Sequence, residues 1–254
     1  MILLDFRYWA FDQVLGCLPD TQIELLRKDF DMLLKVEEFK ILDLIVGKPL
    51  SISSLFFKNE SQIAISPIEN LPGGLIDVVL ELEDKAVVDY SGAAREEVYF
   101  HGQNSLVSHQ LKEIALCGVN AFTDESLFEE YCEDFELTPF CFDLPDNLLA
   151  RDIACFVDDI LLICWEYIED KKVKKQLFSI LKSNGIKVIT VTKNQVSQGI
   201  LNMSLLNGKL LITQEAFCLF TEKQKQEISK QDIEVVPLPF LERLGLKLRD
   251  IILQ

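Results

Sequence analysis

The chain has few of the residues and motifs on which most catalytic and metal sites depend. Only two histidines occur among its 254 residues, His101 and His109, and no glutamate lies between them at metalloprotease spacing. A Cys-x-x-Cys pair is missing, which excludes zinc-finger and thioredoxin-like spacings. Neither Gly-x-Gly-x-x-Gly nor a P-loop sequence occurs. We therefore predict no metal site and no cofactor.

Long apolar runs and targeting signals are also lacking. The apolar run at 160–165, "ILLICW", is far too short to cross a bilayer. The N-terminal segment carries Asp5, Arg7 and Asp12, so it does not have the basic start and clean apolar stretch of a signal peptide. These absences predict a cytoplasmic protein with no membrane partner.

Basic residues are scarce relative to acidic ones. The chain has 25 Lys and Arg against 41 Asp and Glu, a formal net charge of -16. Such a surface repels phosphate backbones, so nucleic acid is excluded as a partner, and a small cationic ligand or a protein partner is favoured. The alternative is that the charge serves solubility alone. Hydrophobic residues make up 49%, which is typical of a globular protein that buries a sizeable core.

Cysteine is present in an odd number, and most of the thiols have apolar neighbours. This pattern predicts buried free thiols in a reducing compartment. The seven are Cys17, Cys117, Cys132, Cys141, Cys155, Cys164 and Cys218.

Hydrophobic periodicity in the first half of the chain predicts alternating helices and strands. Thr21 and Glu24 have capping-box spacing at the start of a helix. The predicted elements are a helix over 20–37, a strand over 39–46, a hairpin over 54–66, a strand pair over 77–90 that bends at Glu83-Asp84, a helix over 102–118 capped by Gly118, a strand over 119–122, and a connector over 124–146 with one short acidic helix.

The second half has clearer signals. Asn207-Gly208 between two apolar runs indicates a hairpin with a tight turn, and Asp158-Asp159 occupies a similar place one unit earlier. The predicted elements are strand pairs over 153–163 and 200–213, helices over 165–185 and 214–231, and strands over 186–191, 233–238 and 246–253.

These elements follow a repeated order of strand, turn, strand, helix and strand. Turns near residues 84, 159 and 207 begin three such units, and the hairpin at 54–66 is a shorter fourth. The helix and strand at 20–46, completed by 246–253, supply a fifth that joins both chain ends. We predict an α/β fold of repeated β-β-α-β units, propeller-like, over 39–254, after an N-terminal helical addition over 1–38. The alternative is an ordinary α/β sandwich.

Four segments make this arrangement similar to the pentein fold, an α/β propeller, over about residues 39–253. They are "GGLIDVVLELEDKAVV", "NLLARDIACFVDDILLI", "GIKVITVTKNQVSQGILNMSLLNGKLLIT" and "IEVVPLPFLERLGLKLRDIIL". The superfamily includes arginine deiminases, amidinotransferases, dimethylarginine hydrolases and a non-catalytic ribosome anti-association factor.

The resemblance implies a chemistry for which this chain lacks residues at the expected places. Family enzymes attack a guanidinium carbon with a cysteine thiolate, while a histidine moves protons and carboxylates hold the cation. Leu248 stands about where the cysteine is expected, and "LARD" at 149–152 stands where the histidine is expected. We therefore expect a non-catalytic interaction or ligand-binding protein, a pseudoenzyme. The alternative is a guanidino-modifying hydrolase, deiminase or amidinotransferase with displaced catalytic residues.

The candidate site residues follow from these two readings. Cys117 or Cys155 is the candidate displaced nucleophile, and His101, beside Gly102, is the candidate acid-base group. Three carboxylates at predicted strand ends are candidates for holding a cation if the units surround a common axis. They are Asp77, Asp152 and Asp250. The alternative is that they cap turns or pair with neighbouring arginines, Arg151 and Arg249.

Overall fold

The computed structural model describes residues 2–4, 20–36, 39–42, 56–58, 62–67, 77, 85–107, 114–243, 247–248 and 252–253. Within these residues the chain forms five three-stranded sheets, each with the same strand order. The first strand of each sheet pairs antiparallel with the second, and the second pairs in parallel with the third. A parallel pair needs a crossover connection. In four of the sheets a described helix lies in that crossover.

The five units follow one another along the chain, and the last unit uses both ends. The first contains β3 (Phe56–Lys58), β4 (Gln62–Ile65) and β5 (Ala86–Asp89). The second contains β6 (Ser105–Val107), β7 (Ile114–Val119), α4 (Glu125–Asp134) and β8 (Thr138–Asp143). The third contains β9 (Ala154–Val157), β10 (Ile160–Ile163), α6 (Lys171–Ser183) and β11 (Lys187–Thr190). The fourth contains β12 (Met203–Leu206), β13 (Lys209–Thr213), α8 (Gln214–Leu219), α9 (Glu222–Ile228) and β14 (Asp232–Val236). The fifth contains β15 (Ile252–Leu253), β1 (Ile2–Leu4), α1 (Asp20–Val36) and β2 (Lys40–Leu42).

The units share one length. Their first strands begin at Phe56, Ser105, Ala154, Met203 and Ile252, so each start follows the one before by 49 residues. The prediction of repeated β-β-α-β units is confirmed. A constant length is expected when each unit buries its own helix on its own sheet and leaves the remaining apolar face to its neighbours.

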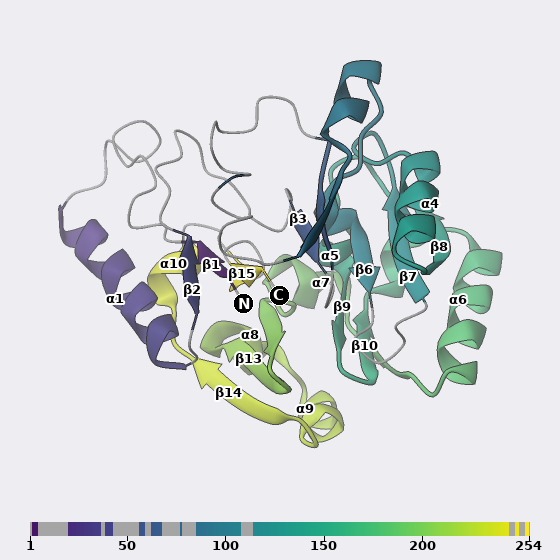
Figure 1. The fold of residues 1–254 in the computed structure, drawn as a ribbon. Helices are drawn as coiled ribbons and strands as arrows, with labels where there is room; N and C mark the ends of the chain where they lie inside the picture. The colour runs from purple at the N-terminus through teal and green to yellow at the C-terminus, as the bar shows by residue number, and fades with distance from the viewer. Residues whose placement is uncertain are drawn as a thin grey trace.

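The fifth sheet closes the ring of units with strands from opposite ends of the chain. β1 is its middle strand: Ile2 and Leu3 pair with Leu253 and Ile252 of β15, and β1 runs parallel to β2. Both ends therefore lie side by side near the middle of the molecule (Figure 1). The proposed boundary at residue 38 stays a prediction, but β1 and α1, from the segment before it, belong to this fifth sheet and its crossover.

The core is continuous across the third and fourth units. All four residues of β10 are buried, and the inner side of α6 covers this sheet with Leu177 and Leu181. A second cluster below α4 is rich in aromatic rings. In it Tyr131 lies 5.3 Å from Phe100 and 4.7 Å from Phe135, centroid to centroid.

The hairpin turns of the third and fourth units are as predicted. Asn207 and Gly208 both have positive φ, 48° and 81°, and Asp158 has φ 52°. Asn, Asp and Gly are the residues that adopt this left-handed conformation most readily. The hairpin over 54–66 is also confirmed, because β3 and β4 pair antiparallel.

The second unit differs from its prediction, because strands lie where a helix is expected. Residues 102–118 do not form one helix, since a 3-10 turn at Gly102–Asn104 is followed by β6 and later by β7. Gly118 lies in β7 and is not a helix cap: a Cβ at this position would overlap the Leu144 side chain. A short run of consecutive apolar residues fits a buried strand as well as a helix, and here it is a strand.

Further differences concern element ends. Of the expected strand at 119–122, Val119 ends β7 and the residues after it form a turn. The expected loop after the acidic helix contains β8, and β5 is the only strand described within 77–90. The helix at 165–185 begins only at Lys171, because Asp170 accepts hydrogen bonds from Lys172 N and Val173 N. The helix at 214–231 divides where Thr221 caps α9. None of the helices in the described ranges is both long and apolar enough to cross a membrane.

Candidate functional site

Two buried asparagines link successive units at their entrances. Asn104 lies directly before β6, and its Oδ1 accepts a hydrogen bond from Ala150 N at 2.9 Å. Asn202 lies directly before β12, and its Oδ1 accepts from Leu248 N at 2.8 Å. In each pair the two residues are 46 apart in the sequence, so the same contact occurs at the second-third and fourth-fifth unit junctions. These asparagines place the segments at 149–152 and 247–248.

An ion pair joins those two segments. Lys247 Nζ lies 2.5 Å from Asp152 Oδ1, and the two side chains are 34% and 23% exposed. Asp152 is held by α5 (Ala150–Ile153), where its Oδ2 accepts from Leu149 N at 3.0 Å. The short distance and partial burial reduce screening by water, so this pair is stronger than a typical surface salt bridge.

This ion pair lies where the pentein resemblance places catalytic groups. Asp152 belongs to the segment expected to carry a histidine, and Lys247 precedes Leu248, which stands about where the nucleophile is expected. The local arrangement therefore offers an ammonium group, a carboxylate and an apolar side chain. The ammonium group and the carboxylate form an ion pair, and none of the three groups is a thiol.

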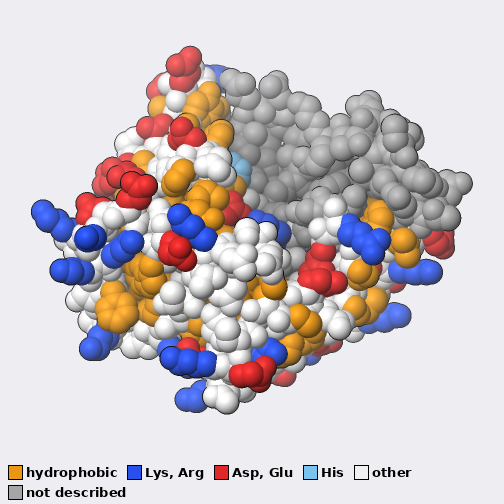
Figure 2. All heavy atoms as spheres, turned by 180° about the vertical axis from the view of Figure 1, so that it is seen from behind, with side chains coloured by type: hydrophobic (Ala, Val, Ile, Leu, Met, Phe, Trp, Pro, Cys, Tyr) orange, Lys and Arg blue, Asp and Glu red, His pale blue; other side chains and the backbone are white. Residues whose placement is uncertain are grey.

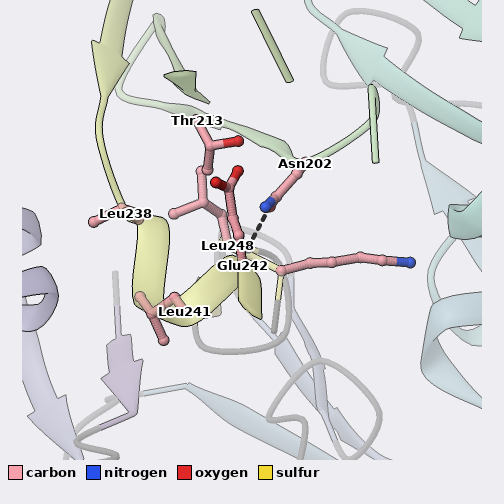
Figure 3. A pocket seen from close by; sticks show the side chains of 7 residues that line it. Asn202, Thr213, Leu238, Leu241, Glu242 and Leu248 are labelled. Atoms are coloured by element: carbon pink, nitrogen blue, oxygen red, sulfur yellow. Dashed lines mark hydrogen bonds between the residues drawn. The ribbon is translucent and has the colours of Figure 1, made fainter. Parts of the chain in front are cut away.

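A narrow crevice lies beside Lys247, between the fourth and fifth units (Figure 3). It leaves no room for a molecule the size of water. Figure 3 shows the Glu242 carboxyl between Thr213 and Asn202. The lining residues are Asn202, Thr213, Leu238, Leu241, Glu242, Lys247 and Leu248.

Glu242 is the carboxyl group that lines this crevice, and two further carboxyl groups, Asp29 of α1 and Glu215 of α8, act on its ionisation. Asp29 of α1 is buried, and its Oδ2 accepts from Phe240 N and Leu241 N, both at 2.9 Å, at the start of α10 (Pro239–Arg243). Burial raises the pKa of Asp29, and these two hydrogen bonds lower it by less. Burial and a hydrogen bond with Glu215 raise the pKa of Glu242 to about 7. Glu242 is therefore largely protonated in mildly acidic solution.

The candidate cysteines lie in different surroundings. Cys117 is fully buried in β7, and burial together with a hydrogen bond to Cys141 strongly raises the pKa of its thiol. Cys155 is half-buried in β9, where its Sγ donates to Phe156 O at 3.5 Å. A catalytic thiol needs a lowered pKa, because the thiolate is the nucleophile. The environment of Cys117 has the opposite effect.

The other candidates are not gathered with Asp152. His101 lies before a short 3-10 turn, and its Nδ1 accepts from Gln103 N at 3.2 Å, as a structural cap does. Asp77 is exposed. Asp250 and His109 lie outside the described residues, as does Arg249. Of the three proposed carboxylates, the structure shows a cationic partner for Asp152 alone within its described part.

Sequence reasoning missed Lys247, although a signal was present. "LARDI" and "LRDI" precede the first strands of the third and fifth units, and Lys247 is displaced from Leu149 by two unit lengths. Aligning the chain on its unit length places Lys247 at a unit entrance. Its pairing with Asp152 does not follow from that alignment.

Solved structures show the same architecture at low sequence identity. The N-terminal domain of ArgZ, an arginine dihydrolase from cyanobacteria, solved as a cysteine-to-serine mutant bound to substrate, matches with a TM-score of 0.74 and 11% identity over 98% of this chain and 95% of that one. The apo structure of ArgZ matches with a TM-score of 0.74 and 11% identity over 99% of this chain. The match covers only 38% of the ArgZ chain in that structure. DDAH from Pseudomonas aeruginosa, complexed with citrulline, matches with a TM-score of 0.62 and 9% identity over 92% and 88% of the two chains.

These likenesses establish the fold class, which is the pentein α/β propeller expected from the sequence. Residues 70–245, more than half of the chain, match the family described as N,N dimethylarginine dimethylhydrolase, eukaryotic. The chain belongs to this family. No curated protein matches it as a relative.

Proposed function

We propose that this protein is a non-catalytic interaction or ligand-binding member of its family, a pseudoenzyme that acts in the cytoplasm. The ion pair between Lys247 and Asp152 carries the proposal. A guanidinium ligand needs a carboxylate partner, and here a lysine of the same chain already neutralises that carboxylate. Of the two partner classes, this observation favours a protein over a small cationic ligand.

Three of the described thiols support the same conclusion. Burial raises the pKa of Cys117, of Cys132 to about 12, and of Cys164. Each of these thiols is therefore protonated at neutral pH, and the protonated form is a poor nucleophile. Leu248 supplies no reactive group at the expected position.

The second candidate is a guanidino-modifying hydrolase with displaced catalytic residues. Membership of a family named for dimethylarginine hydrolysis favours it. In this reading the thiolate of Cys155 or Cys117 attacks the guanidinium carbon and His101 protonates the amine that leaves. Water then hydrolyses the resulting thiouronium, which releases citrulline and frees the thiol.

Catalysis is tested with the full chain and three single variants. Citrulline release from dimethylarginine and from arginine is measured for the wild type, Cys155→Ser, Cys117→Ser and, as the control, Cys218→Ser, which alters an exposed thiol. We expect no citrulline above the background in any sample. Citrulline formation that is lost in Cys155→Ser or Cys117→Ser, but kept in Cys218→Ser, overturns the proposal.

Ligand binding is tested by thermal unfolding with arginine and dimethylarginine. Lys247→Met keeps the apolar stem and releases Asp152 from its ion pair, and Lys209→Met is a matched control. Lys209 has the same 34% side-chain exposure as Lys247 and pairs with Glu234 at 3.0 Å. Because a ligand raises the unfolding temperature by mass action, we expect a shift only in Lys247→Met.

The same measurement separates the two partner classes. A wild-type shift as large as that of Lys247→Met shows that Lys247 does not block the site, and the small cationic ligand then replaces the protein partner. No shift in any of the three proteins shows that Asp152 is not a guanidinium-binding carboxylate.

A further inference from the structure

The outer face of α6 carries a basic stripe that is unexpected in so acidic a protein. Its lysines and one aromatic residue recur at spacings of three and four, so they lie on one side of the helix. The basic stripe consists of Lys171, Lys174, Lys175, Phe178 and Lys182. Phe178 is 50% exposed, and its ring packs edge-to-face with that of Trp165, with 6.5 Å between the ring centroids.

This stripe is unfavourable for an isolated α6. Like charges three or four residues apart repel one another, and lysines in the first turns oppose the helix dipole. Within the described ranges, no carboxylate forms an ion pair with any of its lysines. The stripe therefore exposes positive charge that has no ion-pair partner among the described residues, beside an apolar ring.

The neighbouring unit presents the opposite charge on its own helix. The outer face of α4 exposes an acidic stripe that consists of Glu125, Glu129, Glu130 and Glu133. In the described part of the chain none of these carboxylates has a cationic partner. Phe122, three residues before the start of α4, is 49% exposed, so this surface also combines charge without a described ion-pair partner with an exposed phenylalanine.

The two stripes lie at the same edge of the molecule. Figure 1 shows α4 above α6 at the right edge, and Figure 2, from behind, shows red side chains gathered above blue ones along the left edge. Rotating a second copy by 180° about an axis between the two helices places its α6 opposite α4 and its α4 opposite α6. A two-fold contact then satisfies both stripes at once.

We propose that two copies of this chain associate through the acidic stripe of α4 and the basic stripe of α6, in an isologous dimer. The net charge of -16 on each copy does not prevent this contact, because the Debye length at physiological salt is about 8 Å. Only charges close to the interface then contribute, and there the signs are opposite. Phe178 and Phe122 supply the apolar surface that such a contact buries.

The test is a charge-swap experiment with the full chain. One variant carries Lys171→Glu, Lys174→Glu and Lys175→Glu, and the other carries Glu125→Lys, Glu129→Lys and Glu133→Lys. Sedimentation velocity measures the oligomeric state of each protein alone and of an equimolar mixture. Circular dichroism confirms that each variant is folded, as expected for changes at exposed or half-exposed positions.

We expect the wild type to dimerise in a concentration-dependent manner and to dissociate near 1 M salt, where the Debye length is about 3 Å. Each variant alone is expected to lose affinity by about a hundredfold or more, because like charges then face each other. The mixture of the two variants is expected to restore a heterodimer. A monomeric wild type, a variant that dimerises alone, or a mixture that stays monomeric overturns the proposal.

Discussion

At the scale of single residues, Glu242 is the group whose protonation has a clear consequence for stability. Its Oε2 is buried and has no hydrogen-bond partner among the described residues. Glu215 and Asp29 add negative potential at the same place. An ionised Glu242 is therefore disfavoured in the folded protein, since burial and neighbouring negative charge both oppose ionisation.

This environment predicts that the folded state becomes less stable as the pH rises from about 4.5 to about 7. The ordinary pKa of Glu242 is 4.5, and the folded value is about 7. Between these values the folded protein binds more protons than the unfolded chain, so the free energy of unfolding falls with increasing pH. We expect this group to lower the free energy of unfolding by about 1 kcal/mol across this range. This is well below the value that corresponds to the full pKa shift, because water screens a partly exposed carboxyl. Urea unfolding at several pH values measures it.

Glu242→Gln removes the titrating group and keeps the shape of the side chain. We expect this variant to exceed the wild type in stability at pH 8 by about 1 kcal/mol and to lose most of the pH dependence in this window. Glu169→Gln, at an exposed position, is the control and should follow the wild type. A wild-type profile in Glu242→Gln would show that other groups cause the pH dependence.

At the scale of elements, the unit entrances hold the propeller together. Asn104 donates from Nδ2 to Thr123 Oγ1 at 2.8 Å and to Asn120 Oδ1 at 3.1 Å, in addition to its bond from Ala150 N. Asn202 has the equivalent bond from Leu248 N. At these junctions Ala150 N and Leu248 N form no hydrogen bond within a sheet, and the asparagine side chains accept from them instead.

Replacing either asparagine by alanine should destabilise the fold. Asn104→Ala leaves Ala150 N and Thr123 Oγ1 without this partner, and Asn202→Ala leaves Leu248 N without it. Each buried group left unpaired costs roughly 1–3 kcal/mol. We expect the larger loss for Asn104→Ala, and almost none for the exposed control Asn194→Ala. Chemical unfolding gives the order, and equal stability of all three variants would contradict this role.

At the scale of the whole molecule, the ring of units is continuous except for the gap between the chain ends. That gap falls in the fifth unit, where the turn between β15 and β1 would otherwise lie. Ile2 and Leu253 are directly paired across β1 and β15, so their Cα atoms lie only about 5 Å apart. In the other four units the first and second strands pair antiparallel and follow each other along the chain, so the architecture does not require the opening to lie in the fifth unit.

A circular permutant should therefore fold. A short glycine-serine linker joins residues 254 and 1, and new ends are placed between Asn207 and Gly208, at an exposed turn. We expect native-like circular dichroism and an unfolding temperature within a few degrees of the wild type, since all strand pairs are kept. A permutant opened within β10, which is fully buried, serves as the disruptive control. Failure of the first permutant to fold would contradict the closed ring.

Much of the fold was predictable where turn chemistry is strong. Asp158 and Asn207 hold left-handed turn conformations, and both hairpins were placed correctly. The second unit was not predictable in this way, because the apolar residues before Gly118 fit either a helix or a buried strand. Pro139 favoured a loop, yet it lies on β8, at the edge of its sheet, where a missing N–H is tolerated.

The amino-acid sequence by itself determined the β-β-α-β order, the turns of the third and fourth units and the absence of a thiol at Leu248. These features depend on residues close together in the chain. Only the tertiary structure decided that Lys247 meets Asp152, 95 residues earlier, and that Asn202 holds Leu248. It also decided that α4 and α6, whose exposed side chains carry opposite charges, lie at one edge of the molecule (Figure 1). Such contacts depend on how the units close into a ring, because closure brings together side chains that no local pattern relates.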